Sequence, residues 1–341
     1  MKTLTIIIPT YNVEKYLKRC IDSILYDTTI LKDIEVIIVN DGSIDNSLQI
    51  ANKFEKEYPE TVIVINKENG GHGSTINAGL KIASGKYFRV VDSDDWVNID
   101  DFANYVNKLK SLDEDIVLTN YSRELIYSSE QIKFTYPKEI EYNKKYNLDN
   151  FDFKLLGLDY FFMATSTIKT KILKDINLYL DEKTFYVDME YVVLPTNKLN
   201  TLIYLDYDIY RYFIGRPDQS VSINGYINHR KDHEKVLKRL INYYNEENLS
   251  KNKKEYIKKI LILTLNSHYI IYCKSKVKNK IMQKEIKEFD KYLKNTNKEL
   301  YDDTNNNYKY IKWNRMTNFI FSQTANNLLA RFAGVVERRK K

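Results

Sequence analysis

Three carboxylates occur within four residues at Asp92-Ser93-Asp94-Asp95, directly after the mostly apolar run 87–91. Carboxylates this close repel one another unless a cation or hydrogen bonds offset the repulsion. A hard divalent cation such as Mg²⁺ or Mn²⁺ would do so, since it is usually held by one or two carboxylates together with substrate phosphates. The alternative is an acidic turn that caps the next helix, and a short Asp-x-Asp pattern alone does not separate the two.

Two more polar clusters have the composition of ligand-binding turns. Asn40-Asp41-Gly42-Ser43 follows the apolar run 35–39, and Asp41 either bonds a base or ribose or caps a helix expected from Ser43. Residues 69–74 read Asn-Gly-Gly-His-Gly-Ser, a turn that offers backbone N–H groups to phosphate where a helix starts. It is not a P-loop, because the Gly-Lys-Ser/Thr ending is absent.

Short apolar runs alternate with helical patterns through the first part of the chain. Continuous apolar strands alternating with helices predict a mostly parallel sheet that is covered on both faces. Ligands of such sheets bind at the carboxyl ends of the strands, where the polar clusters fall. The predicted strands are 4–8, 35–39, 62–65, 87–91, 115–118 and 202–205. The predicted helices are 13–25 with Asn12 as N-cap, 43–54, 74–82, 102–110 and 186–198. Residues 121–146 are interpreted as a hairpin or insertion, and 210–222 as a loop.

Taken together, residues 5–12, 36–45 and 85–95 resemble the family-2 inverting glycosyltransferases of the GT-A fold. The order and spacing of these motifs match the family over about the first hundred residues. Farther along, residues 186–191 resemble its second acidic motif, and 210–222 resemble the loop that closes over the donor. The resemblance implies a Rossmann-like, mostly parallel sheet with helices on both faces.

The resemblance also assigns roles to individual residues. Asp41 would hydrogen-bond the nucleobase, commonly uracil in this family, and Asp94 with Asp92 would hold Mn²⁺ or Mg²⁺. Asp188 would be the general base that takes the proton from the acceptor hydroxyl. The implied donor-binding residues are Pro9, Thr10, Tyr11, Val13, Asp41, Asn69, Gly73, Asp92, Ser93, Arg211 and Arg216.

Without the family, Asp188 would be interpreted as an ordinary favourable charge in a helix's first turn. Glu190 either orients Asp188 or stabilises the helix start. Two positions depart from the family pattern: Val187 stands where many members have Glu, and Ile76 where many have an Arg that faces the phosphates. Arg211, Arg216 or the N–H groups at Gly73 and Ser74 are the candidates to compensate.

Composition narrows the class of protein. Hydrophobic residues make up 43% and charged residues 29% of the 341 residues, which is typical of globular chains. Cys20 and Cys273 are far apart in the chain, so we do not expect a disulfide scaffold. We expect instead that the protein works in a reducing cytoplasm. The apolar runs 4–8 and 260–272 are too short for a secretory signal or a membrane span. The net charge of +7 comes without a nucleic-acid reader motif, so no nucleic-acid partner is expected.

The composition changes near residue 228, which predicts a catalytic domain over 1–227 and an α-helical region over 228–341 with an acceptor, oligomer or membrane-surface role. The segment 313–341 has an apolar stripe and a basic end, and it either packs on its own domain or makes peripheral contact with a membrane.

Residues 302–307 are interpreted as a loop. His229 and His233 are one turn apart, and a solvated helix face is favoured there over a zinc site.

The leading hypothesis is an enzyme that moves a sugar from a UDP-sugar to a hydroxyl of a glycan, lipid-linked or glycoprotein acceptor in cell-surface polysaccharide or teichoic acid synthesis. We expect it in the cytoplasm, with peripheral association at the inner face of the membrane and homo-oligomerisation as open hypotheses. The alternative is a catalytically silent nucleotide-sugar-binding or scaffold subunit. Val187 and Ile76 favour the alternative, whereas Asp92, Asp94 and Asp188 oppose it.

Overall fold

The computed structural model describes residues 2–125, 130–157, 159–215, 222–274 and 280–319. The chain divides into two compact units: unit 1 is Met1–Pro217 with Asn248–Glu255, and unit 2 is Asp218–Glu247 with Tyr256–Lys341. Residues 248–255 belong to unit 1 because Asn252 Nδ2 donates to the Asp149 carbonyl at 2.9 Å, and Lys253 Nζ lies 3.1 Å from the Asp149 carboxylate. The roles expected for the two regions stay predictions.

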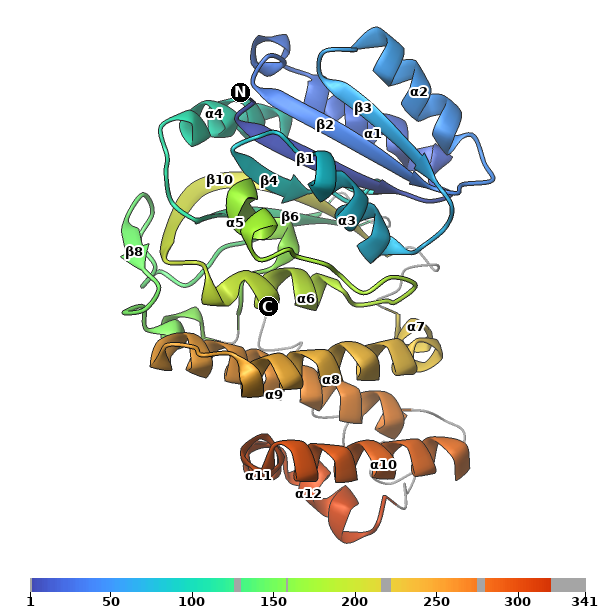
Figure 1. The fold of residues 1–341 in the computed structure, drawn as a ribbon, viewed down its shortest axis with the longest axis vertical. Helices are drawn as coiled ribbons and strands as arrows, with labels where there is room; N and C mark the ends of the chain where they lie inside the picture. The colour runs from blue at the N-terminus through green and yellow to red at the C-terminus, as the bar shows by residue number, and fades with distance from the viewer. Residues whose placement is uncertain (1, 126–129, 158, 216–221, 275–279, 320–341) are drawn as a thin grey trace. The chain divides into compact units, whose positions relative to one another are not determined.

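The strands of unit 1 form one sheet in the order β3-β2-β1-β4-β9-β6-β10-β5, with β7 paired to β6 and β8 to β10 (Figure 1). Strands β3, β2, β1 and β4 run parallel to one another, and β6 is parallel to β10, while β9 runs antiparallel between β4 and β6. The strands are β1 Leu4–Thr10, β2 Ile34–Asp41, β3 Val62–Lys67, β4 Tyr87–Val90, β5 Trp96–Val97, β6 Ile116–Leu125, β7 Gln131–Phe134, β8 Lys145–Asn147, β9 Ser166–Lys169 and β10 Thr201–Ile214.

Helices cover both faces of this sheet, which explains why β1 and β2 are buried along their whole length. On one face Ile6 and Ile8 pack with Leu17 and Ile21 of α1. On the other face Gly79 of α3 lies against Ile7, so closely that a Cβ on the glycine would be 2.6 Å from Ile7 Cδ1. The predicted α/β fold is confirmed. The helices of unit 1 are α1 Glu14–Leu25, η1 Thr28–Ile30, α2 Ser47–Glu57, α3 His72–Ile82, α4 Ile99–Lys110, η2 Phe153–Leu156, η3 Met163–Thr165, α5 Thr170–Asp175, α6 Asp188–Val193 and η4 Leu194–Asn197.

Three local expectations need correction. Asn12 does not cap α1: its backbone is left-handed, with φ of 52°, and its Oδ1 accepts from the Ile44 N–H at 2.9 Å. The helix expected over 186–198 is α only to Val193 and continues as the 3₁₀ turn η4, which contains Pro195. Tyr210 begins no loop, because β10 continues to Ile214 beside β6. The β6–β7 pairing confirms a hairpin within 121–146.

Unit 2 is helical, as the periodicity after residue 228 predicts. Its helices are α7 Ile223–Asn228, α8 Arg230–Glu246, α9 Lys251–Lys274, which begins in unit 1, α10 Lys280–Thr296, α11 Lys298–Asn307 and α12 Lys309–Met316. The prediction of a loop over 302–307 is wrong, since these residues form the end of helix α11. Asn297 caps the start of this helix by accepting from the Leu300 N–H. His233 is buried rather than solvated.

No helix among the described residues is both long and apolar enough to cross a membrane. Only the end of helix α12, residues 313–316, lies within the predicted surface segment 313–341, and Trp313 is 40% exposed. Residues 320–341 of that segment lie outside the described residues. The membrane-contact hypothesis therefore stays a prediction.

Candidate active site

The acidic cluster lies at the carboxyl end of β4, and its three carboxylates differ in surroundings. Asp95 is buried: its carboxylate accepts from Tyr210 Oη at 2.6 Å and from the Phe213 N–H at 2.8 Å. Burial, with the charges of Asp94 and Asp92, holds the pKa of Asp95 well above its usual value. Asp95 therefore fastens the end of β10, and Asp92 and Asp94 stay partly exposed at the edge of the sheet.

Arg19 of α1 contacts this acidic turn. Its Nη2 donates to the Asp94 carbonyl at 3.0 Å, and its guanidinium lies 3.7 Å from the Trp96 ring centroid and 4.6 Å from that of Phe213. A planar guanidinium can stack and donate at once, which a lysine ammonium cannot. No sequence motif marks Arg19, because the Asp94 carbonyl that it bonds is 75 positions away in the chain.

His72, the first residue of α3, faces the acidic turn and is a site residue that the motifs did not identify. Its Nε2 lies 3.2 Å from Asp92 Oδ1, and both side chains are about one-third exposed. Burial lowers the pKa of His72, but contact with Asp92 and the charges of Asp188 and Asp94 outweigh burial and raise it above the usual value. An imidazole thus lies among the carboxylates predicted to act on the donor.

Asp188 is the first residue of α6 and reaches solvent. Neighbouring protein that displaces water raises its pKa; His72 opposes this effect and Asp92 adds to it. Glu190 is buried, and its Oε2 accepts from the Asp181 N–H at 2.9 Å, so it fixes the loop that leads to Asp188. Val187 is also buried, so this departure from the family pattern fills the core. The structure brings Asp92, Asp188 and His72 together.

Asp41 has an internal role. It is 2% exposed, and its carboxylate accepts from the N–H groups of Gly70 and Gly71 at 2.9 and 2.7 Å and from Lys67 Nζ at 2.8 Å. It does not cap a helix at Ser43, because α2 begins only at Ser47. Asp41 therefore shapes the glycine-rich turn, and its contact with a nucleobase stays a prediction.

A groove of about 450 Å³ lies beside this turn, at the carboxyl ends of β2 and β3. Asn69 is exposed next to the groove and donates to the Asp41 carbonyl. Of the residues predicted to hold the base, Tyr11 is 50% exposed and Val13 partly exposed, whereas Thr10 is buried and donates to a backbone carbonyl of its own strand. The lining residues are Asn40, Gly42, Ser43, Leu48, Asn66, Lys67 and Glu68. Pro9 and Ser93 are buried.

Of the groups expected to compensate for Ile76, Arg211 and the Ser74 N–H are already engaged. Arg211 Nη1 lies 3.1 Å from an Asp208 carboxylate oxygen and 3.5 Å from Glu124. The Ser74 N–H donates to the Gly71 carbonyl. Gly73 is packed so tightly that a Cβ there would lie 2.3 Å from the Asp181 carbonyl oxygen. The last candidate, Arg216, lies outside the described residues.

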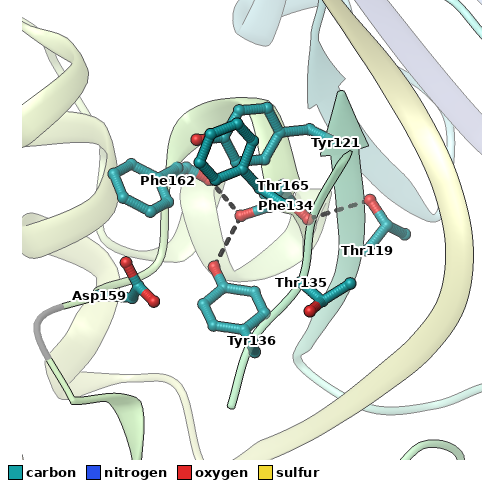
Figure 2. Close-up of a pocket in the computed structure, with 8 residues that line it drawn as sticks. All are labelled: Thr119, Tyr121, Phe134, Thr135, Tyr136, Asp159, Phe162 and Thr165. Carbon is teal, nitrogen blue, oxygen red and sulfur yellow. Dashed lines mark hydrogen bonds between the residues drawn. The ribbon is translucent and has the colours of Figure 1, made fainter. Parts of the chain in front are cut away.

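A second cavity lies beneath the β6–β7 hairpin (Figure 2). Its volume is about 30 Å³, enough for roughly two water molecules and too small for a sugar ring. Figure 2 shows Thr165 between Tyr136 and Thr119, and Thr119 also accepts from the buried Arg89 at 3.3 Å. Its lining residue Thr135 is exposed and Phe134 is partly exposed, so this cavity lies near the surface of unit 1.

Comparison with known proteins decides the family. The sequence pattern of Glycosyl transferase family 2 matches residues 5–176, half of the chain. The chain belongs to this family. The chain is 42% identical to Glycosyltransferase GlyA of Streptococcus pneumoniae over 118 residues, which are 35% of this chain and 16% of GlyA. It is 39% identical to the poly(ribitol-phosphate) beta-glucosyltransferase of Bacillus spizizenii over 117 residues, or 34% of this chain and 18% of that protein. The matches thus span less than a fifth of these two relatives.

The fold of the chain resembles that of S. aureus TarS 1-349 in complex with UDP-GlcNAc, with a TM-score of 0.69 and 20% identity over 97% of this chain and 92% of that one. The mannosyltransferase PcManGT of Pyrobaculum calidifontis, in complex with GDP-Man and Mn²⁺, gives a TM-score of 0.52 at 13% identity, over 89% of this chain and 83% of that one. These likenesses confirm the GT-A fold.

Proposed function

We propose that this glycosyltransferase moves a sugar from a UDP-sugar to an acceptor hydroxyl in cell-surface glycan synthesis, with inversion at the anomeric carbon. The observation that carries the proposal is the meeting of Asp92, at the end of β4, with His72, at the start of α3, close to Asp188, at the start of α6. The names of the relatives support the donor and acceptor classes: one TarS structure holds UDP-GlcNAc, and a Bacillus relative is a poly(ribitol-phosphate) glucosyltransferase.

In this proposal the nucleoside occupies the groove beside Asp41, with the exposed ring of Tyr11 available to pack on the base. The diphosphate then extends toward the acidic turn. Among the described residues, no group of three or more His, Cys, Asp or Glu side chains encloses a metal by itself. Two carboxylates, Asp92 and Asp94, nevertheless fit Mg²⁺ or Mn²⁺, which take oxygen ligands and complete their shell with phosphates and water. Such a cation would neutralise charge on the leaving diphosphate.

Asp188 does the acid–base chemistry. Its carboxylate removes the proton of the acceptor hydroxyl while that oxygen forms a bond to the anomeric carbon and the bond from that carbon to the diphosphate oxygen breaks. The raised pKa of Asp188 makes the carboxylate a stronger base near neutral pH. One displacement inverts the anomeric configuration, and no covalent intermediate with the protein is needed.

The helical unit is assigned a supporting role in this proposal: it selects the acceptor or holds the enzyme at the inner face of the membrane. Deleting 313–341 tests the second of these roles. If liposome binding is lost while transfer to soluble acceptors is kept, the segment is a membrane contact. If liposome binding is unchanged by the deletion, the membrane role is excluded.

Nucleotide binding tests the donor site. We would titrate the protein calorimetrically with UDP, GDP and CDP, with and without Mn²⁺, beside Asp94→Ala and a control, Asp100→Ala, which removes an exposed carboxylate of α4. We expect Mn²⁺-dependent UDP binding that Asp94→Ala weakens by about tenfold or more, or about 1.4 kcal/mol, and that the control keeps. Absence of binding to any nucleotide would favour the silent scaffold instead.

A further inference from the structure

The loop that precedes Asp188 has an unusual backbone. Asn177, Lys183 and Tyr186 have φ of 49°, 50° and 67°, in the left-handed region that residues other than glycine seldom adopt. For a bulky residue such as Tyr186 this conformation is unfavourable, and it persists only where the surroundings impose it. Such outliers cluster at functional sites.

Three contacts fasten this loop to its surroundings. Asn77 of α3 pairs with both backbone groups of Leu180, accepting at 2.8 Å and donating at 2.9 Å. Glu190 of α6 accepts from the Asp181 N–H. Gly73 lies against the Asp181 carbonyl with no room for a Cβ. The loop is therefore one rigid piece with the starts of α3 and α6, the helices that carry His72 and Asp188.

The rigid loop presents aromatic rings to solvent. Phe185 is 41% exposed, Tyr186 is partly exposed, and their ring centroids are 6.2 Å apart. Scattered exposed hydrophobic residues are normal on proteins. These two differ because they are adjacent and held on a clamped backbone. Glu182 and Lys183 are exposed earlier in the same loop.

The position of the pair relative to Asp188 indicates what it binds. Phe185 is three positions before Asp188, so their Cα atoms lie within about 11 Å even if the chain is fully extended. The acceptor must place its reacting hydroxyl at Asp188, so the parts of the acceptor next to that hydroxyl fall within reach of the rings. A pyranose ring has an apolar C–H face that packs on an aromatic ring and hydroxyls that bond to charged side chains, a combination typical of ligand sites.

We propose that Phe185 and Tyr186 form an acceptor subsite that stacks against a pyranose ring of the glycan acceptor. The proposal rests on the proposed function, in which Asp188 is the base. It commits the acceptor to a cyclic sugar at or next to the reacting hydroxyl. An acyclic polyol phosphate, which has no ring face, would not use this subsite.

Saturation-transfer NMR on the full chain with UDP and Mn²⁺ tests this assignment. The probes are methyl β-D-glucopyranoside, methyl N-acetyl-β-D-glucosaminide and, as the acyclic case, ribitol 5-phosphate. We expect saturation of the pyranoside ring protons. The affinity for at least one of the two pyranosides should fall by about tenfold in Phe185→Ala and should be kept in Phe185→Trp. Tyr179→Ala is the matched control, since Tyr179 is 54% exposed in the same loop but farther along the chain from Asp188.

UDP affinity, measured for every variant, separates the possible failures. If wild-type protein and Phe185→Ala bind UDP equally and the pyranosides equally, the subsite is wrong and the proposed function stands. The same holds if UDP binds but only ribitol 5-phosphate receives saturation. If the wild-type protein binds no UDP, the proposed function itself fails. Retained UDP binding in Phe185→Ala also shows that the variant is folded.

Discussion

Acid should destabilise the helical unit because of two buried imidazoles. His233 of α8 and His268 of α9 are 5% and 0% exposed, their rings are stacked with centroids 5.2 Å apart, and their Nδ1 atoms are 3.2 Å apart. Burial lowers the pKa of His233 to about 4. Burial, followed by the charges of His233, Lys231 and Lys238, also lowers the pKa of His268. The folded state therefore holds both imidazoles neutral at neutral pH.

The sign and size of the effect follow from proton linkage. A histidine in the unfolded chain has a pKa near 6.5, so below that pH the unfolded state binds protons that the folded state refuses. Stability is therefore full above about pH 7 and is lost as the pH falls through 6.5 toward 4. Between pH 7 and 5 the free energy of unfolding should fall by about 2 kcal/mol from His233 alone, and His268 acts in the same direction.

The two tryptophans, Trp96 in unit 1 and Trp313 in α12, make the measurement specific. In a Trp96→Phe background, Trp313 fluorescence follows urea unfolding of the helical unit at pH 7, 6 and 5. At pH 7 the His233→Gln variant should be less stable than the wild-type protein, because packing is lost. Between pH 7 and 5, however, its free energy of unfolding should fall by about 2 kcal/mol less than that of the wild-type protein. His229→Gln, which replaces a partly exposed imidazole one turn earlier, should keep the full pH dependence. If His233→Gln keeps it too, the linkage reasoning is refuted.

Three substitutions test the frame of the active site. Arg19→Lys should weaken Mn²⁺-dependent UDP binding by about tenfold, seen by calorimetry, because lysine cannot both stack on Trp96 and bond the acidic turn. Asp41→Ala should lower the free energy of unfolding by about 2 kcal/mol, measured in urea, since it leaves the glycine-rich turn without its acceptor. Gly73→Ala should cost about 1–3 kcal/mol in the same assay, because the added Cβ overlaps the Asp181 carbonyl. A change within about 0.5 kcal/mol for either of the last two would contradict the packing described.

The parts of the fold that local pattern determines could be predicted from the sequence. The apolar runs at β1, β2 and β4 are set by burial on both faces, and the acidic turn follows β4 directly. Contacts between distant residues decided the rest. Residues 210–214 are strand because β6 pairs with them along their length. Residues 302–307 are helical because Asn297 caps a helix that packs Leu300 and Thr304 inward.

The same distinction applies to the candidate site. Motifs predicted Asp92, Asp94 and Asp188, since each follows a recognisable pattern of strand or helix. They did not identify His72 or Arg19, whose roles depend on the Asp92 carboxylate, 20 positions from His72, and on the Asp94 carbonyl, 75 positions from Arg19. A cation next to a cluster of carboxylates is electrostatically favourable, so a search for basic residues in neighbouring turns could have suggested His72. No comparable signal exists for Arg19.

Donor turnover by Asp188→Asn tests the central claim most directly. The protein would be incubated with Mn²⁺ and UDP-GlcNAc or UDP-glucose, with candidate glycan acceptors, and UDP release would be followed for both proteins. We predict that the wild-type protein turns over a UDP-sugar, and that Asp188→Asn binds UDP normally yet loses about 100-fold or more of that rate, the contribution of a general base. The account would be contradicted if Asp188→Asn released UDP as fast as the wild-type protein. It would also be contradicted if the wild-type protein bound UDP but consumed no UDP-sugar.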